Sequence, residues 1–182
     1  MPGIIILIAV VVLVVGYIIT TQRQFINLGE LSDNALSQIG VQQQSRWDAL
    51  TQVAKAAKGY ATHEKETLDS VIGARNPAPP KNAQDVMRDD NQFAEALSRF
   101  NVVVEQYPQL KADALYMKAM GSIEKYEENV RMSRMVFNDT VTKWNRLVKQ
   151  IPSSFVAAIF GFSQRQYLET NQATANMPDL GF

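Results

Sequence analysis

The sequence predicts an all-α protein: an N-terminal transmembrane helix, then an antiparallel bundle of three long helices, and last a short C-terminal apolar segment. Three observations support this prediction. The run Gly3–Ile19 is apolar and uncharged. Beyond it, apolar residues recur at steps of three and four, which is the pattern of amphipathic helices. Prolines interrupt this pattern only around residues 77–80, 108 and 152, where they would end helices.

The N-terminal segment, residues 1–22, is the predicted membrane anchor. No charged side chain precedes Arg23, and a helix of this length crosses the roughly 30 Å hydrocarbon core of a bilayer. The alternative is a cleaved signal peptide, which needs a basic start and a small-x-small cleavage site, and neither is found. Arg23 follows the span, so the positive-inside rule predicts a cytoplasmic C-terminal domain.

The polar remainder is predicted to form one bundle over residues 23–169, followed by a flexible tail over residues 170–182. Because no proline lies between Gly3 and Arg75, we expect the anchor to continue into a first long helix that ends at residues 76–80. Apolar stripes predict a second helix over residues 86–107 and a third over residues 112–151. In the third, Phe137 and Trp144 are expected to be buried.

The apolar segment Phe155–Phe162 is expected at the end of the bundle far from the membrane. With three long helices, the first leaves the membrane, the second returns and the third leaves again. Pro152 would then lie near the linker over residues 76–80. We expect the segment to cap that distal end and to contact a neighbouring subunit, because exposed apolar patches mark interaction sites.

Composition excludes several classes of function. The chain has 18 Lys and Arg residues and 18 Asp and Glu residues, and this balance disfavours broad electrostatic binding of nucleic acid. It has no cysteine and one histidine, which removes thiolate chemistry and leaves too few imidazoles for a multi-histidine metal site. We therefore expect no enzyme, no cofactor and no resident metal.

Several motifs resemble those of the LemA family. They include the VQ-x-x-x-R-x-D core over residues 41–48, the KGYA-x-HE run over residues 58–64, and the closing IFGF at residues 159–162. Asn138 and Asn145 belong to the same resemblance. It implies a single-pass bacterial membrane protein with an antiparallel helical bundle and no established biochemical activity. The family's usual Leu-Ile-Pro-Asn after the aspartate is replaced here by Ala-Leu-Thr-Gln at residues 49–52.

His63, Glu64 and Glu66 form the cluster that most resembles a metal site. A zincin requires His-Glu-x-x-His, but Thr67 stands at the second histidine position. The cluster therefore fits a solvated helix face better than a ligand set. Glu64 falls on the apolar stripe, where it could instead pair with Lys143 or Arg146.

Gln42 and Arg46 interrupt the first apolar stripe and allow two interpretations. They could form a buried polar layer that fixes helix register, or lie at the stripe's edge and extend to water. The basic second half of the third helix, residues 131–149, is expected to pair with acids of the second helix.

From these residues we expect a non-enzymatic membrane scaffold that self-associates, organises or remodels membrane, or recruits other membrane proteins. The alternative is a metal-dependent or regulatory envelope protein that uses His63, Glu64 and Glu66. The lipid bilayer and further copies of the chain are the expected partners, and nucleic acid is not. The residues expected to make interactions are Arg46, Phe155, Ile159, Phe160 and Phe162.

Overall fold

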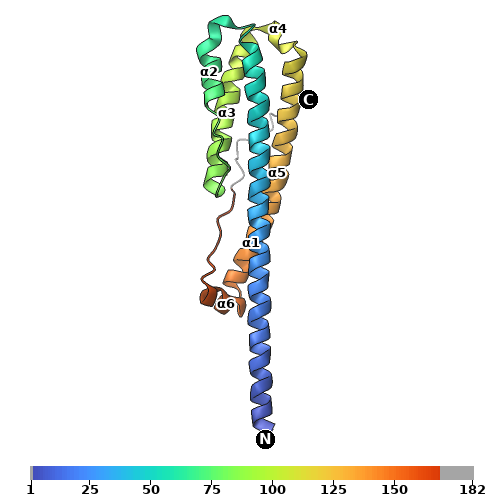
Figure 1. Cartoon of the computed structure of the whole chain (residues 1–182), viewed down its shortest axis with the longest axis vertical. Helices are drawn as coiled ribbons and strands as arrows, with labels where there is room; N and C mark the ends of the chain where they lie inside the picture. Colours follow the sequence, from blue (N-terminus) through green and yellow to red (C-terminus); the bar gives the residue numbers. More distant parts are fainter. Residues whose placement is uncertain (1, 169–182) are drawn as a thin grey trace, which may run out of the picture.

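The computed structural model describes residues 2–168, and this part of the chain is all-helical, as the sequence predicts (Figure 1). The tail predicted over residues 170–182 lies outside the described residues. The elements in chain order are α1 (Pro2–Ala57), the 3-10 turn η1 (Thr62–Glu64), α2 (Lys65–Gly73), α3 (Ala83–Gln106), α4 (Pro108–Lys111), α5 (Ala114–Lys149) and α6 (Ser153–Phe160).

Helix α1 is 56 residues long and joins the apolar segment to the bundle without a break. It is the one helix within residues 2–168 that is long and apolar enough to cross a membrane, and none of its apolar window is buried by the protein. Burial begins at Thr21, which is 4% exposed, and continues at Phe25. The bundle therefore starts directly where the apolar run ends.

The sequence predicted a first long helix that ends at residues 76–80. This prediction is wrong for about the last third of that helix, because α1 ends at Ala57. The amides of Gly59 and Tyr60 donate to the carbonyls of Ala56 and Ala57, which closes a turn. Ala61 then leaves helical geometry and is fully buried. Burial of apolar residues in the turn and in α2 overrides a sequence that contains no proline to stop the helix.

This break adds one reversal to the chain. Helix α2 turns back along α1, α3 runs outward again, and α5 returns towards the anchor (Figure 1). The expectation that Pro152 and Phe155–Phe162 lie far from the membrane is therefore wrong. The segment forms α6 at the end of the bundle next to the anchor, where it contacts both α1 and α5.

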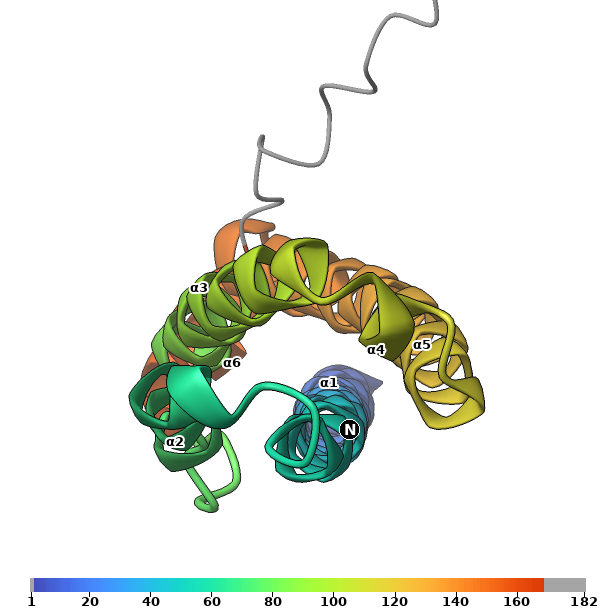
Figure 2. The same cartoon turned by 90° about the horizontal axis from the view of Figure 1, so that it is seen from above.

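Seen along the bundle axis, α2, α3 and α5 lie around α1, and α1 packs most extensively on α5 (Figure 2). The apolar core has three parts. The distal part holds Trp47, Leu50 and Phe100; the middle part holds Ile39, Phe137 and Val141; and the part next to the anchor holds Phe25, Trp144 and Ala157. The predicted burial of Phe137 and Trp144 is confirmed, since each is 6% exposed.

Local sequence explains where the later helices begin and end. The Asn82 side chain accepts from the amide of Asp85 and caps α3, and the Asp113 side chain accepts from the amide of Leu115 and caps α5. Pro108 occupies the first position of α4, where its missing N–H costs nothing. Gly161 ends α6 at a φ of 72°, a left-handed conformation that favours glycine.

Candidate functional site

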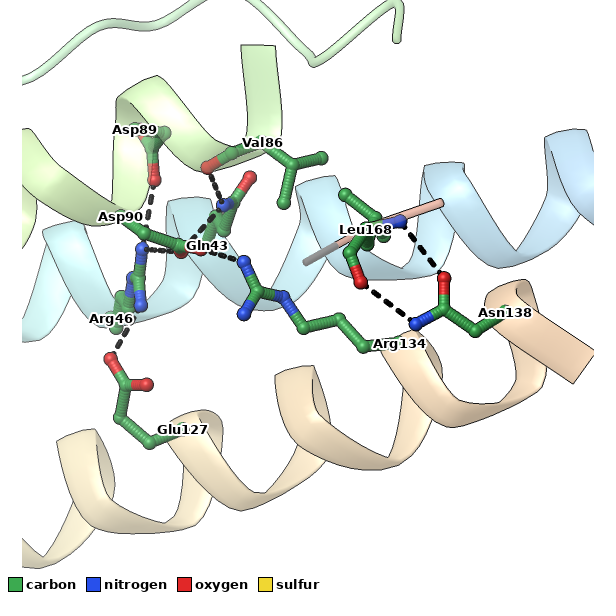
Figure 3. A network of polar contacts seen from close by, with 9 residues as sticks. All are labelled: Gln43, Arg46, Val86, Asp89, Asp90, Glu127, Arg134, Asn138 and Leu168. Atoms are coloured by element: carbon green, nitrogen blue, oxygen red, sulfur yellow. Dashed lines mark hydrogen bonds and ion pairs between the residues drawn. The ribbon is translucent and has the colours of Figure 1, made fainter. Parts of the chain in front are cut away.

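The centre of the bundle holds a buried polar network around Arg46 (Figure 3). The Arg46 side chain is 2% exposed and donates from Nη2 to Asp89 Oδ2 at 3.0 Å and to Asp90 Oδ1 at 2.7 Å. Its Nη1 donates to Glu127 Oε1 at 2.5 Å. The guanidinium carbon also lies 4.3 Å from the centre of the Phe93 ring. One side chain of α1 therefore binds α3 and α5 together.

Neighbouring side chains complete this network. Gln43 donates to the Val86 carbonyl oxygen at 3.1 Å and to Asp90 Oδ1 at 2.9 Å. Arg134, on α5, forms a second ion pair with Asp90. Asp90 of α3 is held by donors from both α1 and α5, and Arg46 binds acids on both α3 and α5, so the network fixes the relative heights of these three helices.

The surroundings of Arg46 keep it charged. Burial alone would lower the pKa of Arg46, but attraction to Glu127 and Asp90, together with hydrogen bonds to Asp90 and Asp89, outweighs burial and raises that pKa. The predicted buried polar layer is confirmed for Arg46, and the interpretation of Arg46 as a side chain reaching water is wrong. Gln42 is half-buried and lies outside this network, where it accepts from Asn129. The predicted pairing of the basic half of α5 with α3 holds for Arg134 and Asp90.

Two asparagines of α5 hold the segment that follows α6. Asn145 donates to the Arg165 carbonyl at 2.9 Å and accepts from the Arg165 amide at 2.8 Å. Asn138 makes the same two contacts with Leu168, at 2.8 and 2.9 Å (Figure 3). The two residues are seven positions apart, two helical turns, so they clamp one extended strand of backbone. Sequence reasoning noted both asparagines only through the family resemblance and missed this role.

The end of the bundle next to the anchor is built from aromatic rings. Phe25 of α1 packs edge-on against Trp144 of α5, with ring centres 5.0 Å apart, and stacks on Phe162 at 4.5 Å. Phe162 is half-buried in this contact, and Phe160 stacks on it at 6.0 Å. The predicted interaction residue Phe162 thus forms the joint between α6 and α1.

The other predicted interaction residues of α6 point outward. Phe155 and Ile159 are 64% and 68% exposed, and Phe160 is 44% exposed. Helix α6 is apolar throughout and its bundle-facing side buries Val156 and Ala157. An exposed apolar surface therefore lies beside the membrane-crossing part of α1, not at the distal end.

His63 and Glu66 are exposed at the opposite end of the bundle. Within residues 2–168 there is no group of three or more His, Cys, Asp or Glu side chains placed to hold a metal ion. The suggested pairing of Glu64 with Lys143 or Arg146 is wrong, because those basic residues lie on the part of α5 next to the anchor. Lys143 instead pairs with Asp139 at 2.7 Å.

The structure gives a physical role to motif residues in the turn that follows α1. Lys58 pairs with Asp69 across the turn, and the Tyr60 hydroxyl donates to Asp113 Oδ2 at 2.8 Å. This hydrogen bond raises the pKa of Tyr60 and lowers that of Asp113, whose other partner is the amide of Leu115. The turn is thus tied to both α2 and the start of α5.

A long apolar helix continues into a bundle that is held by a buried arginine network and by an extended segment bound to α5. These features define a membrane-anchored protein that is all-helical in its described part. The model of the LemA family matches residues 35–182, most of the chain outside the apolar segment. The chain therefore belongs to the LemA family.

Curated relatives match more narrowly. Magnetosome protein MamQ 1 and magnetosome protein MamQ 2 of Paramagnetospirillum magneticum are each 30% identical to this chain over 84 residues. Magnetosome protein MamQ of Magnetospirillum gryphiswaldense matches to the same extent. The match covers 46% of this chain and 31% of each relative, so the relation to MamQ is distant.

Proposed function

We propose that this protein is a non-enzymatic scaffold of the bacterial cell membrane, anchored by one span and self-associating through its bundle. The observation that carries the proposal is the continuity of α1, whose 56 residues run from the apolar segment to the distal core. A helix without a hinge holds the bundle upright on the membrane. It also holds every copy at the same height.

One face of the bundle is suited to self-association. Gln42 of α1 accepts from Asn129 of α5 at 3.2 Å, which marks one seam between the two helices. Leu31 lies eleven positions before Gln42, and Val136 lies seven positions after Asn129, so both fall on the same side of their helices as this contact. Both are more than half exposed.

This seam face, defined by Leu31, Gln42, Asn129 and Val136, is free of charge along α1. Residues 34–45 contain no charged side chain. Anchors confine the copies to one plane, so their seam faces meet at equal height and at high local concentration. We therefore propose that a second copy of this chain packs on the seam face.

Disulfide crosslinking in membranes tests this contact directly, because the chain has no native cysteine. We expect Val136→Cys to give a crosslinked dimer in the full-length protein. Arg131→Cys, five residues earlier on the same helix and on another side of it, is the matched control and should stay monomeric. A full-length protein that remains a monomer in mild detergent and gives no crosslink at Val136 would refute self-association.

The proposal places the C-terminal domain in the cytoplasm. It rests on Arg23, which follows the apolar run, while residues 1–22 carry no basic side chain. Protease added to spheroplasts should leave the bundle intact, and protease added to inverted membrane vesicles should remove it. Digestion in spheroplasts would contradict this orientation.

The relation to magnetosome proteins supports a role in organising a membrane, through assembly of upright bundles and recruitment of other membrane proteins. No step in this proposal requires a cofactor, a metal ion or nucleic acid. Purified full-length protein should therefore carry no stoichiometric metal on elemental analysis. Metal that is retained, and that is lost in His63→Ala, would favour the metal-dependent alternative instead.

A further inference from the structure

The foot of the bundle combines an apolar and a basic surface. The side chains of this foot surface are all exposed and come from α1, α5, α6 and the turn between the last two helices. They are Arg23, Lys143, Arg146, Lys149, Ile151, Phe155, Ile159 and Phe160.

The foot surface lies at the height where a bilayer ends. The roughly 30 Å hydrocarbon core takes about 20 helical residues, so a span that begins at Gly3 leaves the core near Gln22. Phe25, which packs on Trp144 and Phe162, lies three residues further, or about 4.5 Å along the helix. Each headgroup layer of a bilayer is roughly 5–8 Å thick. Helix α6 lies beside α1 at the anchor end of the bundle (Figure 1). With the apolar run inside the hydrocarbon core, this position corresponds to the level of the headgroups.

The apolar part of the foot surface is suited to this depth. Phe155 and Ile159 are one helical turn apart, so their side chains lie on the same side of α6. The protein covers neither of them, whereas Val156 and Ala157 on the other side are each 2% exposed. An open apolar side of a helix that lies beside a membrane is stabilised by burial at the boundary between headgroups and acyl chains.

The basic part of the foot surface is suited to the charge of lipid headgroups. Residues 1–29 and 140–168 contain five basic residues, Arg23, Lys143, Arg146, Lys149 and Arg165, and no acidic residue. Within residues 2–168, Arg146 and Lys149 form no ion pair, whereas Lys143 pairs with Asp139 on the surface and Arg165 pairs with Asp33.

A groove between α1 and α5 brings these charges together with apolar walls. It has a volume of about 370 Å³, and Gln24, Asn27, Leu28, Lys143, Arg146 and Leu147 line it. Two cations and two side-chain amides can hold a phosphate group there, while the two leucines contact the apolar part of a lipid.

We propose that the foot surface is a second membrane contact, in which Phe155 and Ile159 insert into the bilayer that α1 crosses while Lys143, Arg146 and Lys149 bind the phosphates of anionic phospholipids. The proposal rests on the anchoring part of the proposed function and is independent of self-association. In this arrangement the protein is attached to the bilayer at two points, α1 and the foot surface, instead of at α1 alone.

Fluorescence quenching in the full-length protein tests the inserted side. Phe155→Cys provides a single labelling site, and Met117→Cys, an exposed apolar position at the distal end, is the matched control. In phosphatidylcholine vesicles with phosphatidylglycerol, we expect doxyl-labelled lipids to quench a dye at position 155 and aqueous iodide to quench a dye at position 117. If iodide quenches both dyes while the protein still sediments with the vesicles, the second contact is refuted and the anchor is not.

The basic side is tested by comparing doxyl-labelled phosphatidylglycerol with doxyl-labelled phosphatidylcholine at equal content. We expect the anionic quencher to be preferred about fivefold or more, the factor for one basic residue at a membrane surface. Combined Lys143→Gln, Arg146→Gln and Lys149→Gln should abolish the preference. Combined Lys111→Gln, Lys118→Gln and Lys125→Gln removes equal charge at the distal half and should keep it.

Two further outcomes would overturn the lipid assignment. Equal quenching by both lipids in the unmodified protein would refute anionic recognition. Loss of the preference on addition of inorganic phosphate would show that the groove binds the free anion instead of the lipid. Helix circular dichroism on heating checks that each variant is folded, and a labelled Ile159→Cys protein replaces any Phe155 variant that is not.

Discussion

Removing the Arg46 side chain should destabilise the bundle more than removing any exposed arginine. Arg46→Ala leaves Asp89 and Asp90, which are 15% and 11% exposed, without their shared cation. Breaking a buried pair from one side costs about 3–5 kcal/mol. Asp90 keeps Arg134 and Glu127 is 41% exposed, so the lower part of that range, about 3–4 kcal/mol, applies here.

Thermal unfolding of the full-length chain in detergent, followed by helix circular dichroism, measures this loss. For a protein of this size, about 3–4 kcal/mol corresponds to a fall of roughly 6–16 °C in the unfolding midpoint. Arg99→Ala is the matched control, because Arg99 is half exposed and pairs with Glu95 one turn away. Such a pair contributes about 0.3–0.5 kcal/mol. If both variants shift the midpoint equally, the network does not hold the helices together.

Arg46→Lys provides an intermediate case. Lysine keeps the positive charge, but its single ammonium group cannot reproduce the planar fork by which Nη1 and Nη2 bind acids on two different helices. The midpoint should therefore fall between those of the unmodified protein and Arg46→Ala. Full recovery by lysine would show that charge alone matters at this position.

Three further predictions concern packing and pH. Trp144→Ala should cost about 3–5 kcal/mol in the same thermal assay, because it empties a buried aromatic site. Gly40→Ala should cost about 1–3 kcal/mol in denaturant unfolding, since its new Cβ would lie 2.6 Å from the ring carbon of a packed proline, whereas Gly73→Ala, with open space around it, should be neutral or slightly stabilising. Tyr60→Phe should raise the lowered pKa of Asp113 in an NMR titration. Because this pKa is depressed by folding, the contribution of the hydrogen bond to stability is present above the unfolded pKa and lost as the pH falls through the folded one; an unchanged titration would contradict that role.

Apolar periodicity predicted α3, α5 and much of the core, although it did not predict the break between α1 and α2. The spacing that placed Phe137 and Trp144 on one stripe of α5 is the spacing that buries them. Pro108 and Pro152 lie at or beside helix ends, as their missing N–H groups require. These features depend on local chemistry, which a single sequence displays.

Contacts between distant residues were not predictable in the same way. Periodicity showed that Arg46 interrupts a stripe, but not that Asp89, Asp90 and Glu127 would meet it, because each lies on another helix whose height depends on the topology. The clamp by Asn145 was equally hidden. From the sequence alone, an asparagine on a helix is indistinguishable from a surface residue, because the extended segment that it binds is placed only by the fold.

The residue at which α1 ends decides which end of the bundle carries α6. Ending the first helix near residue 75 gives three antiparallel segments and places α6 at the distal end. Ending it at Ala57 adds the short helix α2 as a fourth segment and places α6 at the end next to the anchor. The local difference is a four-residue turn whose only weak helix former is Gly59, at about 1 kcal/mol relative to alanine. The same reversal gathers Lys143, Arg146 and Lys149 beside the anchor, away from the acids that make the chain neutral overall. The neutral net charge, which disfavours broad electrostatic binding of nucleic acid, therefore conceals a basic foot and a more acidic distal part. The basic residues of the foot come together only through the folded topology.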